Sequence, residues 1–200
     1  MKISAAGSRL LDASTLDAVI SMSEVSDKLL TQASQARREH RLADAKRDLV
    51  EAVDLCRKTG TRIELAGALT GLGQIERDLK HGDAAREHYV EAVAIYRGEG
   101  DALKLAHTIR HLGDIHRNEG HRELAEPCYR EALNLYRSRE APPLDLANAL
   151  RGFAILQDDA GEVREAKLLW EEARALYAAV NVEAGVAESS RRLALLEQRQ

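Results

Sequence analysis

The chain has 200 residues, of which 44% are hydrophobic, 4% aromatic and 31% charged, and its formal net charge at pH 7 is −4. This balance argues against nucleic acid or an anionic membrane surface as the partner, and no apolar run approaches the roughly 18 residues of a membrane-spanning helix. The two cysteines, Cys56 and Cys128, form no CxxC pair, so the expected location is the reducing cytoplasm.

Hydrophobic spacing predicts a series of helices separated by short turns. Residues 1–13 have no clear period and are expected to be flexible, and this segment lacks the apolar core of a signal peptide. Further along, apolar residues recur at the intervals of one helical face, with turns expected at 81–83 and 118–120. The predicted helices cover about residues 14–38, 42–58, 62–79, 83–97, two helices within 105–136, 143–159, 162–179 and 182–198.

The chain also repeats itself at intervals of about 40 residues. Ala45, Ala85, Ala125 and Ala166 follow one another at steps of 40, 40 and 41 residues, and aromatic and other small residues hold the same register. A period of about 20–50 residues is typical of a solenoid, in which each unit packs on its neighbours. We therefore expect one domain over residues 14–200. Its repeats are predicted at about 23–60, 61–100, 101–141 and 142–181, with a capping helix at 182–199.

The repeated pattern resembles a known family. Two copies carry a large apolar residue, Leu, Gly, Ala, an aromatic residue and Ala in the same order: Leu69, Leu72, Gly73, Ala85, Tyr89 and Ala92, then Ile109, Leu112, Gly113, Ala125, Tyr129 and Ala132. This pattern is similar to tetratricopeptide (TPR) repeats, in the long-repeat variety found in kinesin light chains. The resemblance implies an all-α, right-handed superhelical solenoid of about four helix pairs plus a C-terminal capping helix. It also implies that the first helix of each pair lines a concave groove.

No motif in the sequence indicates catalysis, a cofactor or a metal ion. His107 and His111 share a helical face and His116 lies on the next turn, but no carboxylate completes an HExxH motif. His81 and His121 occupy equivalent positions of two repeats, and we interpret them as part of the repeat. No glycine loop that could cradle phosphate is present, so the sequence predicts a protein that is not an enzyme and has no cofactor or metal.

Polar residues on the groove side of the first helices are the candidates for binding. The predicted partner-binding residues are Arg37, Gln74, Arg77, His107, Arg110, Asp114, Arg117, Asn118, Asn148, Arg151 and Arg191. Arg37, Arg77 and Arg117 share one repeat column, and Arg110, Arg151 and Arg191 share another. Such arginines could bind carboxylates or phosphates of a partner. Alternatively, they complement helix dipoles or pair internally with Asp114, Asp158 and Asp159 on the same face.

Three functions remain open from the sequence. The first is an interaction scaffold that binds a peptide or a partner protein in the groove. The second is a homodimer formed through the terminal helices and apolar residues such as Leu195 and Leu196. The third is a peptide-sensing regulator like the bacterial regulators that are built on similar repeats. None of the three predicts a nucleic acid or a membrane as partner.

Overall fold

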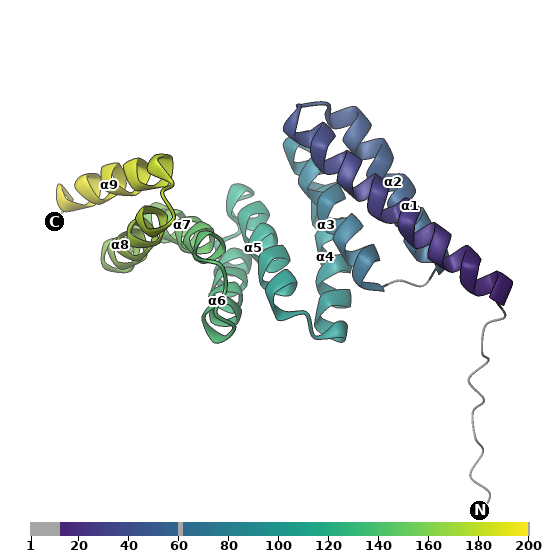
Figure 1. Cartoon of the computed structure of the whole chain (residues 1–200). Helices are drawn as coiled ribbons and strands as arrows, with labels where there is room; N and C mark the ends of the chain where they lie inside the picture. The colour runs from purple at the N-terminus through teal and green to yellow at the C-terminus, as the bar shows by residue number, and fades with distance from the viewer. Residues whose placement is uncertain (1–12, 60–61, 200) are drawn as a thin grey trace, which may run out of the picture.

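The computed structural model describes residues 13–59 and 62–199, with side chains from residue 24 onward. All the secondary structure in these ranges is helical, which confirms the predicted all-α repeat fold (Figure 1). No helix in them is both long and apolar enough to cross a bilayer. The helices are α1 (Ala13–Arg38), α2 (Leu42–Thr59), α3 (Arg62–Asp78), α4 (Gly82–Glu99), α5 (Ala102–Asn118), α6 (Arg122–Ser138), α7 (Pro143–Asp159), α8 (Val163–Ala179) and α9 (Glu183–Glu197). The predicted flexible segment 1–13 lies outside these ranges except for its last residue, Ala13, which begins α1.

The helices pack as successive pairs. Helix α1 packs on α2, α3 on α4, α5 on α6 and α7 on α8, and each pair packs on the next. Figure 1 shows the pairs following one another as an extended array with α1 and α9 at opposite ends. Since each pair contacts mainly its neighbours in sequence, the core is one continuous strip along the array.

Small residues let the paired helices approach closely. The alanines of the repeat column, Ala45, Ala85, Ala125 and Ala166, are all fully buried. At Gly73 of α3, an added Cβ would lie 2.7 Å from the Tyr89 ring of α4. The ring therefore occupies the space that a side chain at this position would need. The same reasoning explains why aromatic and glycine columns alternate in the sequence.

A left-handed residue ends the first helix of each pair. It falls in one repeat column, His40 (φ 58°), Lys80 (φ 69°), Gly120 (φ 80°) and Gly161 (φ 77°). Glycine adopts this conformation without steric cost, whereas His40 and Lys80 adopt it at some cost. The predicted turn at 81–83 is wrong by two residues, because Gly82 begins α4 and Lys80 takes the left-handed position.

An ion-pair ladder connects the second helices of neighbouring pairs. Its three rungs are Arg57–Glu91 at 2.9 Å, Arg97–Glu131 at 2.7 Å and Arg137–Glu172 at 2.6 Å. The arginines step by 40 residues, and the glutamates step by 40 and 41. The ladder thus follows the repeat, on side chains that are largely exposed to solvent.

Helix α9 packs on α8 and covers the last pair. Its own Leu193 and Leu196 are buried, and Asp158 of α7, itself buried, accepts from Arg192 at 3.4 Å and Arg199 at 2.6 Å. The placement of Leu196 among exposed residues available for a dimer is therefore wrong, since its side chain has no exposed surface. Asp158, expected on the groove face, instead holds the capping helix.

Candidate functional site

The first helices of the pairs, α1, α3, α5 and α7, carry most of the predicted binding residues. Helix α1 contacts α3, and α5 contacts α7. Between α3 and α5, long side chains form the connection: Gln74 lies 3.2 Å from His107, and Arg77 lies 2.6 Å from His111. Two neighbouring regions result, which we call the N-terminal groove and the central cluster.

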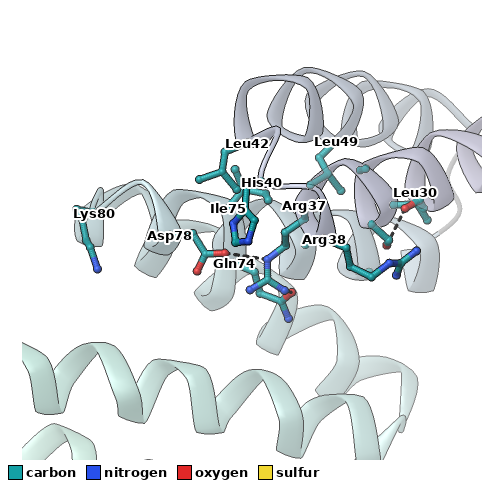
Figure 2. A pocket seen from close by; sticks show the side chains of 14 residues that line it. Leu30, Arg37, Arg38, His40, Leu42, Leu49, Gln74, Ile75, Asp78 and Lys80 are labelled. Atoms are coloured by element: carbon teal, nitrogen blue, oxygen red, sulfur yellow. Dashed lines mark hydrogen bonds and ion pairs between the residues drawn. The ribbon is translucent and has the colours of Figure 1, made fainter.

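The N-terminal groove is a cavity of about 770 Å³ between α1, α2 and α3. Small residues of α1 and α3 are part of its lining, namely Ala33, Ser34, Gly67 and Gly71. Figure 2 shows the polar side chains over its floor, with Arg37 extended toward Asp78 and Gln74. The lining residues are Leu30, Ala33, Ser34, Arg37, Arg38, His40, Leu42, Leu49, Gly67, Gly71, Gln74, Ile75, Asp78 and Lys80.

The charge of the groove is positive. Its lining has three cations, Arg37, Arg38 and Lys80, and one carboxylate, Asp78. The Arg37 guanidinium donates from Nε to Asp78 at 2.8 Å and from one terminal nitrogen to Gln74 at 3.0 Å, so part of its fork is engaged. Lys80 is exposed and makes no ion pair with a described residue. A carboxylate entering the groove would therefore meet unneutralised cations.

The central cluster is defined by Gln74, Arg77, His107, Arg110, His111 and Asp114. The Asp114 carboxylate accepts from Arg110 at 3.0 Å and from the Tyr129 hydroxyl at 2.8 Å, and Arg77 lies 3.9 Å away. Each ring nitrogen of His111 faces a guanidinium nitrogen. Nδ1 lies 2.6 Å from Arg77, and Nε2 lies 2.9 Å from Arg110. A neutral imidazole accepts only one hydrogen bond, so one of these donors lacks a full partner.

Burial controls the protonation of the central cluster. It lowers the pKa of His107 to about 4 and that of His111 to about 3, and the charge of Arg110 acts in the same direction. Burial alone would raise the pKa of Asp114, but the hydrogen bond with His111 and the positive charge of Arg110 outweigh it and hold this pKa well below its usual range. At neutral pH the cluster thus has two cations, one anion and two neutral rings, a net charge of +1.

The remaining predicted residues lie apart from these two regions. Arg151 donates twice to Glu188 of α9, at 2.6 and 2.8 Å, so its planar fork is already occupied. Asn148 accepts from the Tyr177 hydroxyl at 2.8 Å. Arg117 donates to the Gly152 carbonyl at 3.3 Å and to Asn118 at 3.1 Å. Arg191 is exposed and, among the described residues, has no ion-pair partner.

The structure thus brings Arg37, Gln74, Arg77, His107, Arg110 and Asp114 into one continuous polar surface. Internal pairing, the alternative interpretation of the arginine columns, accounts for Arg151 fully and for Arg37 and Arg110 in part. Sequence reasoning missed the groove residues Ser34, Arg38 and Lys80, and it missed His111 as a member of the cluster. One signal for the groove was present: Gly67 and Gly71 lie four residues apart on one face of α3.

The comparisons with known proteins agree with the repeat fold. Residues 64–138 match the family model of the tetratricopeptide repeat. No curated protein sequence matches the chain. Solved structures share its fold, and one of them is BtubC (BKLC) from P. vanneervenii. It gives a TM-score of 0.70 and 18% identity, over 78% of this chain and 64% of that one.

Two further solved structures are similar. The nearly identical TPR-like repeats ascribed to a Podosopora anserina kinesin light chain give a TM-score of 0.69 and 16% identity, over 86% of this chain and 85% of that one. A Rap protein complexed with Competence and Sporulation Factor gives 0.56 and 17%, over 86% of this chain and 52% of that one. The chain thus spans about two thirds of BtubC and about half of Rap. At these identities, the likeness concerns the fold alone.

Proposed function

The chain is a tetratricopeptide-repeat protein, with the repeats recognised over residues 64–138, and from this premise we propose that it is a non-enzymatic scaffold that binds a peptide segment of a partner protein. The N-terminal groove is the proposed binding site, and the central cluster extends it along the array. The observation that carries the proposal is the cavity of about 770 Å³, whose lining includes Gly67 and Gly71.

The shape of the groove suits a peptide. An apolar floor that includes Leu30, Leu49 and Ile75 can bury one or two side chains of a partner, while polar groups along the rim can fix the orientation of its backbone. A Rap protein of similar fold is complexed with Competence and Sporulation Factor, which supports the proposal that this chain also binds a partner.

The charge of the groove indicates which peptides it prefers. Three cations and one carboxylate line it, and the adjoining central cluster adds a net charge of +1. We therefore propose that the preferred segment contains Asp, Glu or a C-terminal carboxylate, and that its affinity falls as salt screens these charges. A cytoplasmic location belongs to this proposal as well.

Two glycines provide the test and its matched control. Gly67 lines the groove, and among the described residues an added Cβ there would meet only the Tyr96 hydroxyl, at 3.7 Å. The first carbon of a leucine side chain therefore has room at this position, and we expect Gly67→Leu to fill part of the groove. Gly98 is exposed on α4, where an added Cβ would approach only Arg62, at 4.0 Å. Gly98→Leu therefore adds the same residue to a helix without entering the groove.

The assay is selection of peptides from a random phage-displayed library on the wild-type chain, followed by fluorescence anisotropy with the synthetic peptides. We expect the selected peptides to be enriched in acidic residues and to bind Gly67→Leu at least about tenfold more weakly, a loss of about 1.4 kcal/mol. Binding to Gly98→Leu should equal that of the wild type. If Gly67→Leu binds the peptides as well as Gly98→Leu does, the groove is not the site.

A further inference from the structure

Three potential metal ligands meet at the turn between α5 and α6. Nδ1 of His116, in the last turn of α5, lies 3.9 Å from Oε2 of Glu119, and Nδ1 of His121 lies 3.4 Å from the same oxygen. One ligand atom from each of the three residues can be chosen so that all lie within 4.8 Å of one another. We call these residues the turn triad.

The backbone of the turn holds the triad in place. The His121 amide donates to the His116 carbonyl at 2.8 Å, and Gly120 between Glu119 and His121 takes the left-handed conformation with φ 80°. These features reverse the chain so that a histidine before the turn and one after it face the same carboxylate. A spacing of five residues within a continuous helix would not do this.

The donor set suits a borderline transition-metal ion. Around a tetrahedral Zn²⁺ with bonds of about 2.0–2.1 Å, ligand atoms lie about 3.3 Å apart. The two separations of 3.4 and 3.9 Å are near this value, and His121 and Glu119 are exposed enough to adjust. The remaining coordination position would be taken by water, as in zinc sites with three protein ligands.

His116 supplies an independent observation. Its Nδ1 is buried and has no hydrogen-bond partner among the described residues, although Glu119 lies on the same side of the ring. Buried polar atoms normally have a partner, and an orphan of this kind points to a ligand that completes it.

We propose that the turn triad is a binding site for Zn²⁺, with His116, Glu119 and His121 as ligands. Arg86 of α4 donates to both oxygens of Glu119, at 2.9 and 3.0 Å, and so orients the carboxylate from outside the metal shell. Its positive charge is offset by Asp83, with which it also pairs. A bound ion would therefore tie α5 to α6 and, through Glu119 and Arg86, to α4.

Among the described residues, the turn between α5 and α6 is the one at which three such ligands meet. Forty residues before it in the sequence, the equivalent positions are Glu76, Leu79 and His81, with a single imidazole. There Glu76 is engaged by Lys46 at 2.8 Å and by His81 at 2.8 Å. His81 and His121 occupy equivalent positions of the repeat and each lies beside a glutamate, but among the described residues only His121 has a second histidine, His116, at the same carboxylate. His81→Gln is thus a matched control for His121→Gln.

The experiment is titration of the tag-free, full-length chain with Zn²⁺ in the presence of excess Mg²⁺, by calorimetry. We expect one ion to bind per chain, and His121→Gln and Glu119→Gln each to lower the affinity at least about tenfold, because loss of even an outer-shell partner costs about 10–100-fold. The control His81→Gln should bind as the wild type does. Circular dichroism checks that each variant is folded, which the exposure of His121 favours.

Cobalt gives a second readout. Co²⁺ in a tetrahedral site absorbs strongly in the visible range, and this absorption should appear in the wild type and in His81→Gln but not in His121→Gln. The melting temperature should rise with Zn²⁺ in the same two proteins only, since an ion that binds the folded state stabilises it. If no ion binds, or if His121→Gln binds Zn²⁺ as tightly as His81→Gln, the proposed site is refuted.

Discussion

Two alanine substitutions in one helix should change stability in opposite directions. Gly67 and Gly73 both lie in the interior of α3, so replacing either with alanine gives the same gain in helix propensity, about 0.5–1 kcal/mol. At Gly67 the new methyl group meets only the Tyr96 hydroxyl, at 3.7 Å. Gly67→Ala is therefore expected to raise the free energy of unfolding by about 0.5–1 kcal/mol.

At Gly73 the methyl group has no room. It would lie 2.7, 2.9 and 2.9 Å from three atoms of the Tyr89 ring, which is itself fully buried and cannot move without displacing its neighbours. Overpacking of this kind costs about 1–3 kcal/mol. Since the propensity gain is common to both variants, Gly73→Ala should be less stable than Gly67→Ala by about 1–3 kcal/mol.

Urea unfolding followed by far-ultraviolet circular dichroism measures this difference. Repeat arrays can unfold in stages, so the slope against urea must be the same in both variants before their free energies are compared. A Gly73→Ala variant at least as stable as Gly67→Ala would refute the close approach of α3 to Tyr89. It would also refute close packing as the cause of the alternating glycine and aromatic columns.

Three further predictions concern polar groups. Buried His107 has a pKa of about 4 in the folded chain, whereas in the unfolded chain it takes up a proton below about pH 6.5. The free energy of unfolding should therefore fall as the pH is lowered from 6.5 toward 4, and it should fall less steeply in His107→Gln. Urea unfolding at several pH values measures this. Tyr129→Phe removes the hydrogen bond to Asp114 and should lower the unfolding free energy by about 1.5–3 kcal/mol. The Tyr89 hydroxyl is buried and has no partner in the part of the chain that the structure describes, so Tyr89→Phe should leave thermal melting unchanged or raise it. Arg97→Ala breaks an exposed ion pair and should cost less than about 1 kcal/mol, a difference that disappears in high salt.

The architecture could be predicted because its causes are local. A helix pair is visible in the sequence as apolar residues at helical intervals, and a close approach of helices as a glycine or alanine that recurs every 40 residues. The turn near residue 80 is misplaced by sequence reasoning because the sequence signal, Gly82, differs from the residue that adopts the left-handed conformation, Lys80. Packing of the two helices imposes that conformation on a lysine, which intrinsic preference would not predict.

The candidate site could be predicted only in part. The side chains that face the groove follow from helical periodicity, and Arg37, Gln74 and Arg110 are found in this way. Whether an arginine is free depends on partners distant in sequence, such as Glu188, which lies 37 residues after Arg151. The cavity depends on how far apart α1 and α3 lie, a property of the packing of several helices that no local pattern contains.

The ion-pair ladder has a consequence for how such a chain can change length. Each arginine contributes one half of a contact and each glutamate the other half, and both halves recur at the same place in successive units. A duplicated copy of residues 61–100, inserted after residue 100, would offer its glutamate to Arg97 and its own arginine to Glu131. Growth by whole units therefore leaves every contact matched, whereas an insertion of part of a unit would put the two halves out of step.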